Sequence, residues 1–295
     1  MLVVVFGATG NTGREVCRSL SQKADVRIRA VSRNPSGASG LPAHEVRAVT
    51  WTERSQLRSA LEGADAAYFM LPTGLHNGSL FEFRDAYSRS FVELANDVKL
   101  KRVVSLSSFG AHLAEKSGVL KGLCQAEKNL QEFAGEAVII RPGYFWQNFA
   151  GNVSGIKEKG FFGGYPVDLD VSLLFAHTAD IGSAAAELLT AAALPFHRVL
   201  YVGHRERATF REVSSLIAEK SGRKGLMWTN VGYDAARSFM LGRGMPAEIV
   251  GNLIEFFEAI NTGRAMDDFT PDRLIPTPIG KAEFAAWFAG QIGSG

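Results

Sequence analysis

Hydrophobic and polar positions follow two periods along the first half of the chain. Short apolar runs have the length of buried strands, and the segments between them carry apolar positions three or four residues apart, as helices do. The predicted strands are Leu2–Phe6, Val26–Val31, Val46–Trp51, Ala66–Leu71, Arg102–Leu106 and Ala137–Arg141. The predicted helices are Asn11–Ser21, Glu53–Leu61, Leu80–Val98 and Gly118–Phe133. This alternation predicts a parallel sheet with helices on both faces and right-handed crossovers.

The regular alternation ends near Tyr144. Gly160–Pro166 has the composition of an irregular loop. Further helices and one short strand are predicted at Asp180–Ala193, Val199–Val202, Phe210–Lys220, Ala247–Ile260 and Lys281–Phe288, with Thr209 as the N-cap of the third segment. We therefore expect an α/β domain at residues 1–150 and a smaller α/β lobe at residues 151–295, interleaved with the end of the sheet.

Composition and charge exclude several classes of protein. The 295 residues are 46% hydrophobic and 21% charged, which is typical of a globular chain and unlike a disordered one. The net charge is +2 and the basic residues are interspersed with acids, so no nucleic-acid-binding surface is expected. Cys17 and Cys124 are too few for a disulfide scaffold or a cysteine zinc cluster, and we expect both to be buried and reduced.

The amino-terminal residues lack the basic region, apolar run and cleavage site of a secretory signal. No window approaches the ~20 apolar residues of a membrane span. We expect a cytoplasmic protein without a membrane contact.

A glycine-rich turn connects the first strand to the first helix. It reads Gly7-Ala8-Thr9-Gly10-Asn11-Thr12-Gly13. Gly7 permits a tight turn, Gly10 lets main-chain amides approach a pyrophosphate, and Gly13 lets the helix pack close to the sheet. The anion then lies at a helix N-terminus, where free N–H groups and the dipole favour negative charge. The turn predicts a dinucleotide site in a Rossmann-type, doubly wound fold.

The end of the second strand selects between the two nicotinamide dinucleotides. An NAD site usually has an acid here, about 20 residues beyond the glycines, whereas this chain has Ser32 and Arg33. Ser32 can donate to a phosphate, and Arg33 can pair with a 2′-phosphate and stack on adenine. These residues favour NADP(H). The alternative is that Arg33 is an ordinary surface arginine.

Three segments together resemble the NmrA-like branch of the atypical short-chain dehydrogenases. They are the glycine turn, Ser32–Pro35 and Ile140–Asn148, and Phe175–Gly182 resembles a later segment of that family. The similarity covers nearly the whole chain. That branch includes NADPH-dependent quinone reductases, related ene and imine reductases, and regulators that bind the nucleotide without turning it over. The resemblance implies that this chain has one of these functions.

The resemblance also shows which catalytic residues this chain lacks. Short-chain dehydrogenases usually act through Tyr-x-x-x-Lys, where the tyrosine protonates the substrate, and extended members often carry a Glu four residues further on. If Glu127 is that Glu, Leu123 and Val119 occupy the lysine and tyrosine positions. If Lys128 is the lysine, Cys124 stands in place of the tyrosine. The tyrosine is absent in both alignments, so carbonyl reduction by the tyrosine route is not expected.

Ligands of an open parallel sheet bind beyond the carboxyl ends of its strands. We expect three groups of residues there, apart from the glycine turn, and the alternative for each is ordinary turn structure. They are Leu71, Pro72 and Thr73 on the adenine side, Ser107, Ser108 and Phe109 near the nicotinamide ribose, and Pro142, Gly143 and Tyr144 beside the nicotinamide. Weak candidates for the catalytic residue are Ser107, His112, Lys128 and Tyr144.

Aromatic residues concentrate after the sixth strand. They could stack a flat acceptor or form a hydrophobic core, and both hypotheses stay open. The residues are Tyr144, Phe145, Trp146, Phe149, Phe161, Phe162 and Tyr165. Asn148 either orients a carboxamide or caps the next helix, and we favour the cap. The histidines show no i, i+4 pairing, so no metal site is expected.

The sequence thus favours an NADPH-dependent oxidoreductase that passes hydride to a small planar acceptor, quinones first. The alternative is a non-enzymatic NADP(H) sensor of the NmrA type that acts through a protein partner. An ene or imine reductase of secondary metabolism is a third hypothesis. The chain could also associate with copies of itself.

Overall fold

A computed structural model describes residues 1–72 and 79–293. Among these residues the central sheet has eight strands in the order β10-β9-β6-β5-β4-β1-β2-β3. Their bounds are β1 Leu2–Phe6, β2 Arg27–Ser32, β3 Glu45–Ala48, β4 Ala66–Met70, β5 Arg102–Leu106, β6 Glu136–Pro142, β9 Val199–His204 and β10 Leu274–Thr277. All strand pairs from β3 to β6 are parallel, which confirms the predicted α/β class.

The strand order reverses beside β1. The chain runs from β1 outward through β2 to β3, then returns to the other side of β1 with β4 and continues to β6. Crossovers leave this point in opposite directions, so the carboxyl ends of β1 and β4 border the crevice in which such sheets bind ligands.

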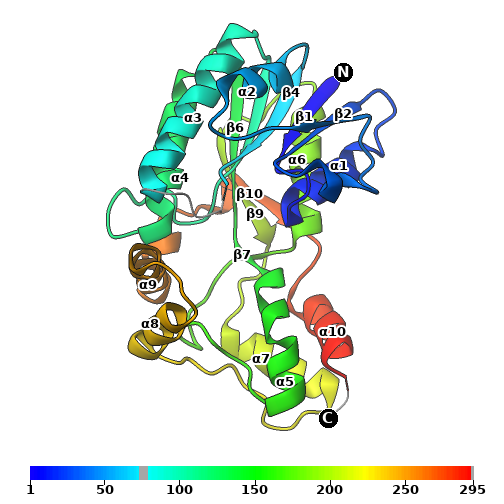
Figure 1. Cartoon of the computed structure of the whole chain (residues 1–295). Helices are drawn as coiled ribbons and strands as arrows, with labels where there is room; N and C mark the ends of the chain where they lie inside the picture. Colours follow the sequence, from blue (N-terminus) through cyan, green and yellow to red (C-terminus); the bar gives the residue numbers. More distant parts are fainter. Residues whose placement is uncertain (73–78, 294–295) are drawn as a thin grey trace. The chain divides into compact units, whose positions relative to one another are not determined.

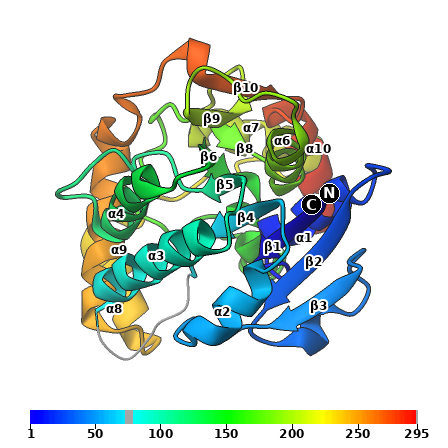
Figure 2. The same cartoon turned by 90° about the horizontal axis from the view of Figure 1, so that it is seen from above.

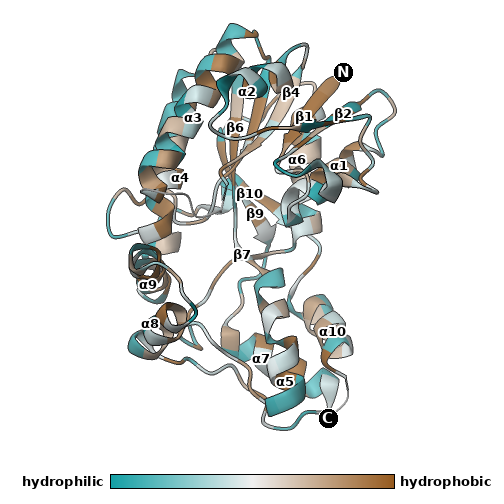
Figure 3. Cartoon of the chain, in the orientation of Figure 1, coloured by the Kyte–Doolittle hydropathy of each residue, from teal (hydrophilic) through white to brown (hydrophobic). Residues whose placement is uncertain are grey.

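Helices cover both faces of the sheet (Figure 2). Helices α1 (Asn11–Leu20) and α6 (Thr178–Thr190) pack together on one face. Helices α2 (Arg54–Leu61), α3 (Leu80–Asp97) and α4 (Lys121–Asn129) contribute to the core on the other face. Strand β1 is strongly hydrophobic along its length, whereas the helices present both hydrophobic and hydrophilic residues (Figure 3). That difference follows from a strand buried on both faces and helices buried on one.

The described chain divides into two compact units whose segments alternate along the sequence. Unit 1 comprises Met1–Ser108, Gly122–Arg141 and Thr178–Val202, and unit 2 comprises Phe109–Lys121, Pro142–His177 and Gly203–Gly295. A single boundary at residue 150 therefore does not describe the division. Residues 178–202 join unit 1 because α6 packs against α1 and β9 lies beside β6.

Unit 2 is mainly helical. Helix α7 packs against α10, and α8 lies beside α9 (Figure 1). The bounds are β7 Tyr144–Phe145, α5 Val153–Lys159, β8 Phe175–Ala176, α7 Phe210–Ser221, α8 Tyr233–Gly242, α9 Ala247–Asn261 and α10 Lys281–Ile292. Thr209 caps α7 as predicted. The sequence analysis did not predict α5, α8, β7, β8 or β10.

The predicted helix at Gly118–Phe133 is broken at both ends. It consists of a 3-10 turn at Gly118–Leu120, helix α4, and a second 3-10 turn at Leu130–Glu132. Gly118 has a φ of +55°, and a Cβ there would stand 1.7 Å from the carbonyl oxygen of Asn252 in α9. The close approach of the α9 backbone leaves no room for a Cβ at this position, and the left-handed φ of Gly118 interrupts the continuous helix that was expected.

No described helix combines the length and the apolar composition needed to cross a membrane.

Candidate functional site

The glycine turn has the geometry of an anion cradle. Gly7 has a φ of +67°, and the N–H of Gly10 donates to the carbonyl oxygen of Gly7 at 2.9 Å. A Cβ on Gly13 would lie 2.2 Å from that same oxygen. Gly10 precedes α1 in an extended conformation, and no side chain caps the helix. The first amides of α1 are therefore left for an anion, and the turn fits a pyrophosphate.

Side chains from β2 brace this turn. The hydroxyl of Thr9 lies 3.0 Å from that of Ser32, and the N–H of Ala8 donates to the carbonyl of Val31 at 3.1 Å. The Ser32 hydroxyl also donates to the carbonyl oxygen of Asn34. Buried Ser32 thus links the tip of β2 to the phosphate turn.

Two guanidinium groups lie on the segments that form this part of unit 1. Arg33 is exposed at the tip of β2. Arg14, in the first turns of α1, donates to the carbonyl oxygen of Thr9 at 3.5 Å. Arg14 was not among the residues expected at this site.

The end of β4 closes the turn from the other side. The sulfur of Met70 lies 2.9 Å from the point where a Cβ on Gly7 would stand, so a side chain at Gly7 would collide with it. Leu71 and Pro72 are buried, while the third expected residue, Thr73, lies outside the described residues.

A buried polar network lies at the ends of β5 and β6. The hydroxyl of Ser107, directly after β5, donates to Oε1 of Glu127 in α4. Arg141, in β6, donates from Nε to Oε1 at 2.9 Å and from Nη2 to Oε2 at 2.5 Å. The three residues are 5% to 8% exposed, so the ion pair is bidentate and largely removed from water.

Two opposing effects act on the pKa of Arg141. Burial lowers the pKa of its guanidinium, but the hydrogen bonds and charge of Glu127, with a smaller contribution from Tyr201 in β9, outweigh burial and raise the pKa overall. Arg141 is therefore a permanent cation that holds Glu127 in place. Glu127 was expected here only from the family alignment, and no role was predicted for Arg141.

Lys128 and Cys124 have no place in this network. Lys128 is exposed on α4, and the thiol of Cys124 has its pKa raised chiefly by burial. Both cysteines are free and buried, as expected. Leu123 packs against the core of unit 1. Neither alignment therefore supplies an acid beside Ser107.

Pro142, Gly143 and Tyr144 belong to unit 2. Tyr144 is 5% exposed, and its N–H donates to the carbonyl of Leu174 at 2.8 Å. Burial raises the pKa of its hydroxyl, which also bonds to Asn148. The tyrosine is thus a poor acid, and Asn148 contacts it instead of capping a helix. The capping prediction for Asn148 is wrong.

The aromatic residues of unit 2 pack mainly against one another. The rings of Trp146 and Phe175 stack at 4.2 Å, and Phe149 lies 5.3 Å from Phe210. Trp146, Phe149 and Phe162 are each 1% exposed. Their rings form a hydrophobic core, while Phe161 and Tyr165 are 42% and 40% exposed and remain available to a ligand.

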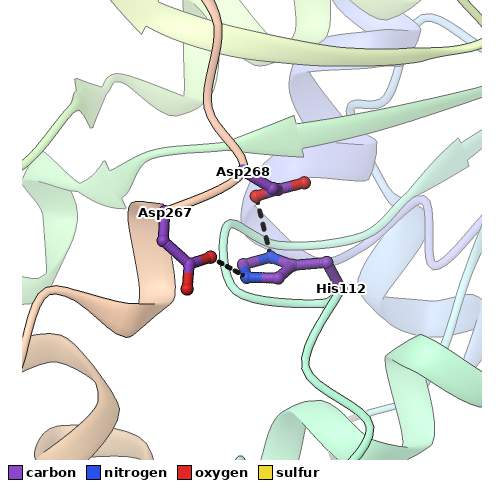
Figure 4. A group of neighbouring side chains, drawn as sticks. All are labelled: His112, Asp267 and Asp268. Carbon is purple, nitrogen blue, oxygen red and sulfur yellow. Dashed lines mark ion pairs between the residues drawn. The ribbon is translucent and has the colours of Figure 1, made fainter.

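His112 is held between two carboxylates within unit 2 (Figure 4). Asp267 lies 2.5 Å from its Nε2 and Asp268 lies 2.8 Å from its Nδ1. The ligand atoms are within 4.8 Å of one another, but the two carboxylates contact different ring nitrogens and therefore lie on different sides of the ring. The absence of a metal site stays a prediction. His112 is therefore engaged on both nitrogens and is a weak candidate for the proton donor.

Comparison with known proteins agrees with this geometry. The family model described as NAD(P)H-binding matches residues 7–170. The chain belongs to this NAD(P)H-binding family. The nicotinamide dinucleotide expected from the glycine turn is thereby confirmed.

Three individual proteins illustrate the relationship. An NAD(P)H azoreductase from Xenophilus azovorans is 25% identical over 87% of this chain and 86% of its own length. An NmrA-like family domain-containing oxidoreductase from Aspergillus campestris is 42% identical over 23% of this chain and 21% of its own, and it bears out the NmrA-like resemblance. The NADPH-dependent quinone oxidoreductase QOR2 of Escherichia coli, complexed with NADPH, has the same fold, with a TM-score of 0.79, 21% identity, and coverage of 98% of this chain and 99% of its own.

Proposed function

We propose that this protein is an NADPH-dependent reductase that passes hydride to a small, planar, electron-poor acceptor, with quinones first and azo compounds next. The observation that carries the proposal is an intact phosphate turn in a chain that lacks the tyrosine of the usual acid. The relative named as an azoreductase and the structural neighbour named as a quinone oxidoreductase support this acceptor class.

The preference for NADPH rests on charge at the tip of β2. Arg33 is exposed there and no acid stands in the segment 31–35. A carboxylate would accept from a ribose 2′-hydroxyl but repel a 2′-phosphate, whereas a guanidinium pairs with that phosphate. Arg14, at the carbonyl of Thr9, adds a second positive charge at the turn.

The residues of the chain bind and orient; they supply no strong acid. A bound dinucleotide would supply the hydride from its nicotinamide ring. The α1 amides would hold the pyrophosphate, and Ser107 and Ser108 after β5 would hold the nicotinamide half. An electron-poor acceptor stabilises the added electron pair itself, so the proton that completes its reduction comes from water.

The test is a panel of quinones, azo dyes and enones with purified protein and NADPH. We expect NADPH oxidation with one equivalent of acceptor reduced, and a marked preference for NADPH over NADH. Gly13→Ala is the negative control, because its Cβ would collide with the carbonyl of Gly7. NADPH consumption no faster than in the absence of protein, for every acceptor, would contradict the proposal.

The sensor hypothesis is favoured by one specific observation. None of the four weak candidates for a catalytic acid is placed as a free donor. Ser107 bonds to Glu127, and His112 lies between two carboxylates. Tyr144 is buried with a raised pKa, and Lys128 is exposed on α4. A sensor should bind NADP⁺ and NADPH with different affinities, show no turnover, and co-purify with a protein partner or a second copy.

A further inference from the structure

We propose that Glu127 and Arg141 are positioning residues that make the Ser107 hydroxyl a hydrogen-bond acceptor for the nicotinamide half of the cofactor. This inference rests on the proposed function, because it assigns these residues a role toward the bound dinucleotide. The three side chains all belong to unit 1.

The geometry places Ser107 where a cofactor can reach it. Ser107 directly follows β5, and its N–H donates to the carbonyl of Ile140 in β6 at 2.8 Å. It therefore stands at the carboxyl edge of the sheet, the edge that also carries the phosphate turn after β1. Gly7 and Ser107 follow strands separated by β4 alone.

The hydrogen bonds of this network decide whether the Ser107 hydroxyl donates to a ligand or accepts from it. A hydroxyl carries one hydrogen and two lone pairs, and the hydrogen of Ser107 is directed to Glu127. Arg141 can only donate, and it donates to both carboxylate oxygens of Glu127. Glu127 is thus held as an acceptor, and Ser107 retains lone pairs but no hydrogen for a ligand.

The nicotinamide half of the cofactor carries two kinds of donor. One is the carboxamide N–H of the nicotinamide ring and the other is a hydroxyl of the attached ribose. Ser107, as an acceptor, would accept from either of them. A serine arranged in this way does not protonate an acceptor, which agrees with water as the source of the proton.

Glu127→Gln disturbs this arrangement without changing its shape. Oε1 of Glu127 accepts from both Ser107 and Nε of Arg141, and Oε2 accepts from Nη2. Because Arg141 can only donate, the NH₂ group of a glutamine faces a donor of Arg141 in either orientation of the amide. The glutamine therefore no longer holds the hydrogen of Ser107 in one direction. We expect NADPH, titrated by its fluorescence, to bind about tenfold more weakly to this variant.

Ser107→Ala removes the acceptor and leaves the ion pair intact. We expect a similar, about tenfold, loss of NADPH affinity. The double variant Ser107→Ala/Glu127→Gln should lose no more than Ser107→Ala alone, because Glu127 acts through Ser107. Glu132→Gln, an exposed carboxylate in the turn that follows α4, is the matched control and should bind NADPH as the wild type does.

Thermal unfolding separates positioning from stability. Glu127→Gln leaves Arg141 without its charge partner, so it should unfold at a lower temperature whatever its role in binding. A purely structural role predicts reduced stability with unchanged affinity in the folded protein, and that result would overturn the proposal. If Glu127→Gln does not fold, Ser107→Ala alone decides, and unchanged affinity in that variant also overturns it.

An oxidised analogue identifies the donor. The 3-acetylpyridine analogue of NADP⁺ lacks the carboxamide N–H but keeps the ribose, and its affinity is measured by calorimetry beside that of NADP⁺. If Ser107→Ala weakens NADP⁺ alone, the donor is the carboxamide; if it weakens both equally, the donor is a ribose hydroxyl; if it weakens neither, the proposal fails. Wild-type protein that binds no dinucleotide refutes the proposed function as well, whereas unaltered binding by the variants refutes only the role of these three residues.

Discussion

Gly13 lies so close to Gly7 that a Cβ on Gly13 would stand 2.2 Å from the carbonyl oxygen of Gly7. That oxygen already accepts from the N–H of Gly10 at 2.9 Å. The carbonyl of Gly7 is therefore enclosed by Gly10 and Gly13, and a methyl group on Gly13 must displace the backbone at Gly7.

Gly13→Ala should disrupt the phosphate turn. We expect NADPH affinity to fall at least tenfold and stability to fall by about 1–3 kcal/mol, because the methyl group overpacks a backbone contact. Calorimetry with NADPH and thermal unfolding measure the two effects. Gly10→Ala is the matched control for stability, since its Cβ would lie 3.2 Å from the same oxygen, and it should destabilise the fold less than Gly13→Ala, although a methyl group at Gly10 also stands where the pyrophosphate approaches. Equal stability of the two variants would contradict this account of the turn.

Arg33→Asp should change the choice of cofactor. Replacing an exposed guanidinium with a carboxylate removes the partner of the 2′-phosphate and adds repulsion, so we expect NADPH affinity to fall about tenfold while NADH affinity changes little. Titration with both dinucleotides measures the ratio. Arg27→Asp, exposed at the opposite end of β2, is the control. If the ratio of affinities stays the same, Arg33 is not the selector.

Asp65 should contribute to stability in a pH-dependent way. Its carboxylate accepts from Lys101 at 2.7 Å and from the N–H of Leu2 at 2.9 Å, and these bonds hold its pKa below the ordinary value. A depressed pKa means that the contribution is present above the pKa of the unfolded chain and is lost as pH falls through the folded value. Asp65→Asn should therefore lower stability at pH 7 by about 0.5–1 kcal/mol. Unfolding curves of variant and wild type should converge near pH 2; a constant difference would argue against this role.

His112→Gln should test the histidine as proton donor. Both ring nitrogens lie against carboxylates of Asp267 and Asp268, so we expect the variant to lose about 1 kcal/mol of stability with these partly exposed contacts. Its kcat with quinones should stay within about twofold of the wild type, because both ring nitrogens face carboxylates and not a substrate. Steady-state kinetics over pH 5 to 9 measure this. A loss of kcat of a hundredfold or more, with the fold intact, would make His112 the acid.

The aromatic residues of unit 2 should separate into core and surface. Phe149→Ala should cost about 3–5 kcal/mol, because the ring is 1% exposed and is surrounded by other rings. Phe161→Ala, at 42% exposure, should change stability by less than about 0.5 kcal/mol. Any role of Phe161 in binding acceptors then appears as a higher KM for the quinone. Large destabilisation by the second variant would show that Phe161 belongs to the core.

Strong periodic segments were predicted with nearly correct bounds. Helix α3 begins at Leu80 as expected and ends at Asp97, one residue before the predicted end. Strand β3 was predicted at Val46–Trp51 but covers Glu45–Ala48, because Trp51 packs into the core of unit 1 instead of continuing the strand. Helix α8, whose buried residues are Ala236 and Met240, was not predicted.

The candidate site divides in the same way. The phosphate turn was predicted from local sequence alone, because the glycines at this spacing meet steric requirements that arise within the turn itself. The contact between His112 and Asp267, in contrast, joins residues that no local pattern connects. The partners of His112 lie more than 150 residues away along the chain.

The order of residues by itself determined that a dinucleotide is bound after the first strand, since tight turns and free helix amides are local properties of the backbone. Only the tertiary structure decided that Glu127 holds Ser107 and is held by Arg141, and that most of the aromatic residues of unit 2 form its core. Hydrogen-bond direction and burial depend on which distant segments pack together, and packing is a property of the folded chain.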